Sequence, residues 1–448
     1  MSSVGGVAVA ANWDGSWGRL PVTYVFRGKL RDPHLWHLAQ QRTVQRVYNQ
    51  ASQYHQDLLN FLEKHRCLMR QILVEDGYLR SATRLGDIGV EKHLSAVDSS
   101  ARQVVGYATS YLVGVALSVN SRQDCHGIFY DLHCPNSFSL GVLVDYLRAY
   151  LESILLNPQL TVGDYYVILD QSFAVVLSHI YNALRGWFTY HDELLSYGIK
   201  PWTDDFTKSW FDLLYAGLGE ESSFLRMFGN PKVIGVTKQA TANTIVRMLQ
   251  KVLMRRYTIN TFGLNLLNDR RLLDILMEPG EYLTPQPLAM NRNVYENLLD
   301  IYDKVPKNYQ NYFRSLPDIC SFFGKLGCRD GTDGEIYYTY YFPFSGSRVY
   351  RLEFCRNLLC DNGCYDYYGG GSTFQELLNC FNCSLLPDFM EPYNQYLVDK
   401  RVKDEVGQLE EFVRYQEVRL QDEYLRQVKD VTPLDLRYLQ LLSYRYRT

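Results

Sequence analysis

Residues 335–342 read Glu-Ile-Tyr-Tyr-Thr-Tyr-Tyr-Phe, and residues 348–354 read Arg-Val-Tyr-Arg-Leu-Glu-Phe. Aromatic and β-branched residues dominate both stretches, and such residues favour strands. The five residues between them, Pro-Phe-Ser-Gly-Ser at 343–347, have the length and composition of a turn. The sequence therefore predicts a β-hairpin over 335–354.

The second arm of this hairpin alternates apolar and charged side chains. Tyr350, Leu352 and Phe354 alternate with Arg351 and Glu353. Because successive side chains of a strand point to opposite faces, this pattern predicts one packed face and one face in contact with water or a partner.

Helical patterns dominate the rest of the chain. Apolar residues recur at helical spacing over 38–62, 143–155, 241–257 and 395–429, and residues 166–184 are apolar nearly all round. The first four stretches predict amphipathic helices, and the fifth predicts a central buried helix. A short early strand is expected at 22–26.

These elements predict an α+β protein with a mostly helical body, a Tyr- and Cys-rich C-terminal subdomain containing the hairpin, and a long C-terminal helix. We divide the chain into a flexible N-terminal arm over 1–20, a mainly helical body over 21–300 and a third region over 301–448. Pro285, Pro287 and Pro306 mark the boundary before the third region.

The composition is that of a folded protein. Hydrophobic residues make up 46% of the 448 residues and charged residues 21%, with 46 Lys+Arg against 49 Asp+Glu. A disordered chain and a strongly basic nucleic-acid coat are thereby excluded. The apolar stretches fall short of the roughly 20 residues that span a bilayer, so no membrane segment is expected.

Local catalytic motifs are absent from the sequence. It has no Gly-x4-Gly-Lys-[Ser/Thr] phosphate loop, no His-Glu-x2-His zinc helix and no Gly-x-Ser-x-Gly nucleophile elbow. The adjacent acids at 204–205, 220–221 and 410–411 are typical of solvated surface charges. We therefore expect no enzyme activity and no cofactor.

One alternative function rests on metal binding. Cys360, Cys364, Cys380 and Cys383 come close to the spacing of a four-thiolate zinc site, although small buried cysteines would give the same pattern. A zinc-stabilised interaction module is one alternative. A second pattern, Cys125-His126 with His133-Cys134, also offers mixed ligands.

The other alternative is an RNA-binding accessory protein. Arg247, Lys251 and Arg255 recur at every fourth residue and so lie along one side of the predicted helix over 241–257. Such a stripe can follow a phosphate backbone. An ordinary solvated helix face would look the same, and the net charge of −3 offers no long-range attraction to RNA.

The 36 tyrosines favour an assembly protein over an enzyme. A tyrosine ring covers apolar area while its hydroxyl stays hydrated, which suits a surface that is wet before assembly and covered afterwards. A tyrosine-rich core would give the same count.

The length, the neutral Tyr-rich composition and segments such as Trp-His-Leu-Ala-Gln-Gln at 36–41 and Tyr-Tyr-Thr-Tyr-Tyr-Phe at 337–342 resemble a structural protein of turreted double-stranded RNA viruses. The family is that of the cypovirus large protrusion proteins, counterparts of inner-capsid clamp proteins. This resemblance implies a virion protein, present in the host cytoplasm during assembly, that clamps neighbouring subunits on the outside of an icosahedral shell. It would occur in many copies per particle, and its partners would be the inner-shell protein and the turret protein.

The contact surfaces expected for such a clamp are the hairpin, the long C-terminal helix and the N-terminal arm. The residues predicted to contact the shell are Tyr338, Tyr340, Tyr350, Val402, Leu409 and Val413.

Overall fold

In the computed structural model, the described residues are 33–82, 94–105, 109–120, 125–135, 141–156, 166–201, 204–237, 242–290, 292–305, 307–325, 334–361, 364–365, 371–385 and 391–427. The predicted arm over 1–20 and the predicted strand over 22–26 lie outside them. None of the described helices combines the length and the apolar character needed to span a membrane.

The helices have the following bounds: α1 Pro33–Glu75, α2 Gly141–Leu155, α3 Phe173–Ser196, α4 Asp205–Leu218, α5 Ser223–Gly229, α6 Thr244–Tyr257, α7 Asp269–Leu276, α8 Arg292–Lys304, α9 Lys307–Gln310, α10 Leu316–Ser321, α11 Ser372–Ser384 and α12 Tyr393–Gln427. Short 3-10 helices are η2 Phe262–Leu266, η3 Asn311–Phe313 and η4 Arg356–Leu359.

The strands are β1 Leu79–Ser81, β2 Leu94–Val105, β3 Thr109–Val119, β4 Cys125–Pro135, β5 Tyr166–Leu169, β6 Val233–Thr237, β7 Glu281–Leu283, β8 Gln286–Pro287, β9 Ala289–Met290, β10 Gly324–Lys325, β11 Ile336–Phe342, β12 Tyr350–Cys355, β13 Cys360–Asp361 and β14 Cys364–Tyr365. The α+β class predicted from the sequence is confirmed.

One mixed sheet organises the described part of the chain. Its order is β1-β7-β11-β12-β6-β5-β2-β3-β4, with β8 paired to β11. Strands β2, β5 and β6 run parallel to one another, whereas β3 and β4 continue from β2 as an antiparallel meander. The predicted hairpin forms as β11 and β12, and β12 pairs with β6 inside the same sheet.

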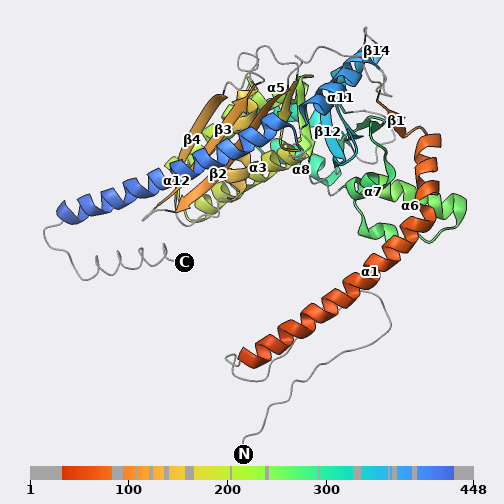
Figure 1. Cartoon of the computed structure of the whole chain (residues 1–448). Helices are drawn as coiled ribbons and strands as arrows, with labels where there is room; N and C mark the ends of the chain where they lie inside the picture. The colour runs from red at the N-terminus through yellow and green to blue at the C-terminus, as the bar shows by residue number, and fades with distance from the viewer. Residues whose placement is uncertain are drawn as a thin grey trace, which may run out of the picture.

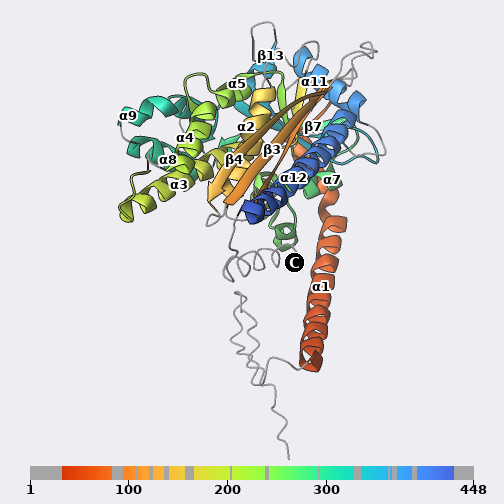
Figure 2. The same ribbon diagram turned by 90° about the vertical axis from the view of Figure 1, so that its left-hand side faces the viewer.

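Helices cover both faces of the sheet (Figures 1 and 2). On one face, α2 and α3 pack on β2, β3 and β5 within the largest apolar core. On the other face, α12 packs its valines on β2 and β3, and α11 packs on β5, β6 and β12. Because helices cover both faces, the central strands are buried on both faces, as in residues 112–119 of β3.

Helix α12 lies along β2 because its apolar stripe matches that strand. Val398, Val402 and Val406 recur at every fourth residue and pack in one cluster with apolar residues of β2 and β3. Polar contacts fix the register of the helix on the sheet. The Asn394 amide donates to the Leu94 carbonyl at 2.7 Å, and Arg102 pairs with Glu410 at 2.7 Å.

Four of the predicted helices are confirmed as α1, α2, α6 and α12. The prediction of one helix over 166–184 is wrong in its first part. Residues 166–169 form strand β5, buried on both faces, and α3 begins only at Phe173 after a capping Ser172. A buried strand and a buried helix are equally apolar, so periodicity could not separate them.

The prediction that one face of the second hairpin arm meets water or a partner is also wrong. Every residue of β12 is buried, including Arg351 at 9% exposure and Glu353 at 0%. These two charges are tolerated in the interior because they pair with each other at 2.9 Å.

Candidate metal centre

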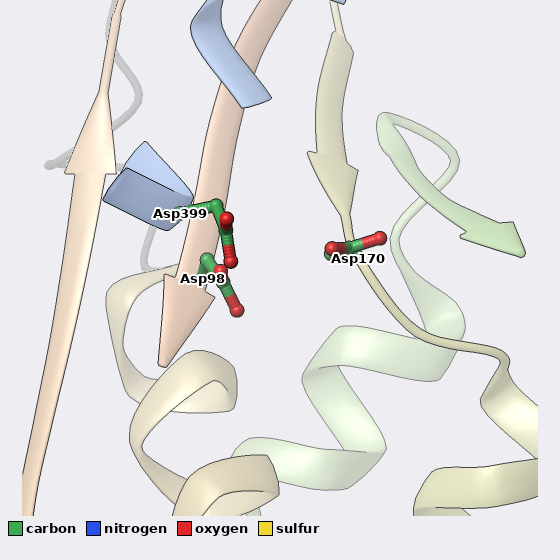
Figure 3. A group of neighbouring side chains, drawn as sticks. All are labelled: Asp98, Asp170 and Asp399. Atoms are coloured by element: carbon green, nitrogen blue, oxygen red, sulfur yellow. The ribbon is translucent and has the colours of Figure 1, made fainter. Parts of the chain in front are cut away.

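Three aspartates from distant parts of the chain converge beside the central strands. Asp98 lies on β2, Asp170 directly follows β5, and Asp399 lies on α12. One carboxylate oxygen of each lies within 4.8 Å of the others, and the three side chains face a common space (Figure 3). Within the described ranges, no other group of three His, Cys, Asp or Glu side chains meets this distance.

The sheet register explains why Asp98 and Asp170 are neighbours. The parallel ladder pairs Ala96 with Ile168 and Val97 with Leu169, so the next step along both strands brings Asp98 level with Asp170. Side chains two residues apart share a face, and Ala96 faces α12. Asp98 therefore faces the helix that carries Asp399, at the end of β5 where parallel sheets commonly bind ligands.

A fourth carboxylate, Glu152, approaches from the opposite face of β2. It lies on α2, is 2% exposed, and accepts a hydrogen bond from the Ser99 hydroxyl at 2.5 Å. The Gln171 amide also donates to Glu152. Ser99 in turn donates its backbone N–H to Asp98 at 2.7 Å, so Ser99 links the two carboxyl groups through the strand.

Burial and mutual repulsion raise the pKa values of the two buried carboxyl groups. For Asp98, burial is the largest cause and the charges of Glu152 and Asp170 add to it, raising the pKa from 3.8 to about 8. For Glu152, burial raises the pKa from 4.5 to about 7, against the hydrogen bond from Ser99. Burial is the largest cause of both shifts, and the hydrogen bonds and positive charge around the two carboxyl groups offset it only in part.

Two basic side chains supply that partial neutralisation. Arg148 on α2 donates its Nε–H to the Ser99 carbonyl at 3.2 Å, and its charge lowers the pKa values of Asp98 and Glu152. Lys403 pairs with Asp399 at 2.7 Å, one helical turn further along α12. Lys403 is 61% exposed, so solvent screens this pair.

The donor set suits a hard divalent cation. Mg²⁺, Mn²⁺ and Ca²⁺ prefer carboxylate oxygens, whereas structural zinc sites use thiolate and imidazole ligands. The three aspartates provide only oxygen donors, and the raised pKa of Asp98 would fall when a cation binds. These residues therefore fit a magnesium- or manganese-type centre.

The aromatic and aliphatic residues predicted as shell contacts pack largely inside this chain. Tyr338, Tyr340, Tyr350 and Val402 are buried, and Leu409 and Val413 are half-buried. Arg351 stacks over the Tyr338 ring with its Cζ 4.4 Å from the centroid. The hairpin tyrosines thus account for part of the tyrosine count as core residues.

The mixed Cys and His pattern does not form one metal site. Cys125-His126 begins strand β4, and His133-Cys134 lies near its other end. At about 3.3 Å per residue the two pairs are roughly 23 Å apart along the strand. One ion cannot bind both pairs.

The four-cysteine zinc pattern stays a prediction. Cys380 is buried and Cys383 exposed on α11, and Cys360 is half-buried on β13. The Cys364 side chain lies outside the described residues, so the geometry of the complete set is not tested.

The predicted basic stripe is exposed on α6. Arg247, Lys251 and Arg255 all face solvent. Figure 1 shows α6 beside α7, well separated from β2 and the middle of α12. The stripe and the carboxylate cluster are therefore separate features.

None of the four acidic residues of this centre was predicted from the sequence. No short motif contains them, because they come from separate strands and helices between positions 98 and 399. One local signal was available: Asp-Gln-Ser at 170–172 interrupts an apolar stretch, and Ser is a preferred N-cap. That signal marks a strand–helix corner with an acid on it.

No family model matches the chain, and no curated protein matches it. Solved structures similar to it include NurA nuclease from Sulfolobus solfataricus, at 12% identity and a TM-score of 0.43 over 87% of this chain and 99% of that one. A structure of NurA bound to dAMP and manganese matches at 12% identity and 0.41, covering 81% and 93%. Ciona intestinalis Endonuclease V in complex with DNA matches at 10% identity and 0.27, covering 79% and 99%.

These similar structures are nucleases, which contradicts the predicted resemblance to a capsid clamp protein. The same finding overturns three further predictions. These are the structural virion protein, the viral shell and turret partners, and the absence of enzyme activity. The capsid prediction failed because it took abundant tyrosine as a sign of an assembly surface. Tyrosines such as Tyr146, Tyr340 and Tyr350 instead fill the core of this chain.

Proposed function

We propose that this protein is a metal-dependent nuclease that hydrolyses phosphodiester bonds. The observation that carries the proposal is the convergence of Asp98, Asp170 and Asp399 within 4.8 Å, with buried Glu152 behind them. Divalent ions held by such carboxylates act as Lewis acids toward phosphate oxygens and lower the pKa of bound water.

The residues of the chain have separable roles in this proposal. The three aspartates would hold the cation, and Ser99 and Gln171 orient Glu152 behind them through hydrogen bonds. In the reaction, a water oxygen forms a bond to phosphorus while an ester P–O bond breaks, which yields an alcohol and a phosphate monoester. Phosphate oxygens readily bind a Mg²⁺-type cation that carboxylates hold, so nucleic acid, a chain of phosphodiesters, is the first substrate to test.

The test is cleavage of end-labelled single-stranded and double-stranded DNA by the purified chain, with Mn²⁺ or Mg²⁺ and with EDTA. We expect cleavage only with the metal ion. Asp98→Asn and Asp170→Asn should each lower the rate by more than about a hundredfold, because each removes a metal ligand that supplies several kcal/mol of transition-state stabilisation.

The matched control is Asp300→Asn. Asp300 is exposed on α8 and pairs with Lys304 at 2.9 Å, in the same i,i+4 arrangement as Asp399 with Lys403. This control should retain the wild-type rate. Equal cleavage by Asp98→Asn and the wild type, or cleavage that survives EDTA, would contradict the proposal.

A further inference from the structure

The corner that carries Asp170 is held by a buried carboxylate. Residues 170–172 connect β5 to α3, and Ser172 caps α3. The Glu353 carboxylate accepts hydrogen bonds from the Ser172 hydroxyl at 2.8 and 2.9 Å and from the Phe173 backbone N–H at 2.8 Å. Glu353 lies on β12, two strands away from β5, with β6 between them.

Glu353 is placed where a negative charge is stabilised. Its carboxylate meets the N-terminus of a 24-residue helix, where unpaired backbone N–H groups and the helix dipole favour an anion. Arg351 balances its charge at 2.9 Å, and the Tyr338 ring covers the guanidinium. Glu353 is 0% exposed, so its hydrogen bonds must come from groups of the chain.

The corner that Glu353 anchors carries two groups of the candidate metal centre. Asp170 contributes a carboxylate to the cluster, and Gln171 donates to Glu152. The Gln171 backbone is itself packed tightly against Gly235 of β6. A Cβ added to Gly235 would lie only 2.9 Å from the Gln171 carbonyl oxygen. A shift of this corner would therefore move Asp170 and Gln171 together.

We propose that Glu353 is a positioning residue of the metal centre, which acts through Ser172 and Phe173 to set where Asp170 meets Asp98 and Asp399. This inference rests on the proposed function. Outer groups that orient the ligands of a metal site commonly change metal affinity by 10- to 100-fold when they are substituted.

The experiment measures Mn²⁺ affinity of the full chain by the electron paramagnetic resonance signal of free Mn²⁺, with thermal unfolding recorded on the same samples. We expect Glu353→Gln to raise the Kd for Mn²⁺ by about tenfold or more, because the amide has only one oxygen. If that oxygen accepts from Ser172 and Phe173, the NH2 group is left against the Arg351 guanidinium, and if it faces Arg351, the hydrogen bond from Phe173 is lost. Ser172→Ala keeps the hydrogen bond from the Phe173 backbone N–H to Glu353, so it should raise the Kd by a smaller factor.

The control is Thr339→Val, another fully buried polar position in the same sheet. The Thr339 hydroxyl donates to the Leu283 carbonyl on β7, away from the corner. This variant should unfold at a lower temperature and keep the wild-type Kd, which separates positioning from general destabilisation.

Each outcome decides the question. A folded Glu353→Gln with the wild-type Kd would overturn the positioning role, as would a rise in Kd for Thr339→Val equal to that for Glu353→Gln. If Glu353→Gln fails to fold, an unchanged Kd in Ser172→Ala overturns the inference and a raised Kd supports it. A wild-type chain that binds no Mn²⁺ would overturn the proposed function itself, and this result is visible before any variant is made.

Discussion

At the scale of single residues, the centre combines acidic side chains with very different environments. Asp98 and Glu152 are buried, and their pKa values are raised to about 8 and about 7. Asp399 is partly exposed and already paired with Lys403. At neutral pH Asp98 is therefore mostly protonated unless a cation displaces the proton, whereas Glu152 is about half ionised.

This competition predicts that Mn²⁺ binding strengthens as the pH rises. A metal ion binds the carboxylate form, and below pH 8 much of Asp98 is protonated. We expect the Kd for Mn²⁺ to fall by roughly tenfold or more between pH 6 and pH 8, measured by isothermal titration calorimetry in two buffers of different ionisation enthalpy. Mn²⁺ binding should also release protons, which the two buffers would detect. A Kd that does not change with pH would contradict the raised pKa of Asp98.

At the scale of elements, the centre depends on how closely β6 approaches the β5–α3 corner. Gly235 lies on β6, with the Gln171 carbonyl oxygen 2.9 Å from where a Cβ would be and the Phe173 ring at 3.5 Å. Because the nearest atom belongs to the backbone, it cannot rotate away as a side chain could.

Gly235→Ala should therefore displace the corner. We expect a loss of about 1–3 kcal/mol of stability, the usual cost of overpacking a buried site, together with weaker Mn²⁺ binding. Chemical denaturation and a metal titration of the same variant would measure both effects. An unchanged metal affinity would show that the corner tolerates the extra methyl group.

Gly346→Ala provides the contrasting case. Its φ of +91° strains any L-residue, yet no atom lies within 4 Å of the added Cβ. Gly346 belongs to the turn between β11 and β12, outside the corner. This variant should lower stability without weakening metal binding.

At the scale of the whole molecule, the buried acids couple folding to pH and to metal. Asp98 and Glu152 have higher pKa values in the folded chain than their ordinary values of 3.8 and 4.5, so the folded chain binds more protons than the unfolded chain between about pH 4 and pH 8. Stability then decreases as the pH rises through this window, and the contribution of these groups is fully present only below it.

We accordingly expect the melting temperature without metal to fall more steeply between pH 5 and pH 8 for the wild type than for Asp98→Asn. Adding Mn²⁺ should raise the wild-type melting temperature most at pH 8, since a ligand that binds only the folded state stabilises it. Differential scanning calorimetry with and without Mn²⁺ would measure both slopes. Parallel slopes for the two proteins would contradict the assigned protonation of Asp98.

The sequence by itself determined those elements whose signal is local. Runs of aromatic and β-branched residues on either side of a five-residue turn specified the hairpin of β11 and β12, and apolar residues at helical spacing specified α1, α2, α6 and α12. These patterns suffice because each reflects interactions between residues close along the chain.

Only the tertiary structure decided which residues meet. The central sheet buries β5 on both faces, so its four apolar residues lack the alternation that would mark a strand. Asp98, Glu152, Asp170 and Asp399 are four acids among 49, and nothing in their local sequence distinguishes them as a group. They become a candidate metal centre because a parallel register, two covering helices and a capped corner bring them to one place, and this convergence depends on contacts between segments far apart in the sequence.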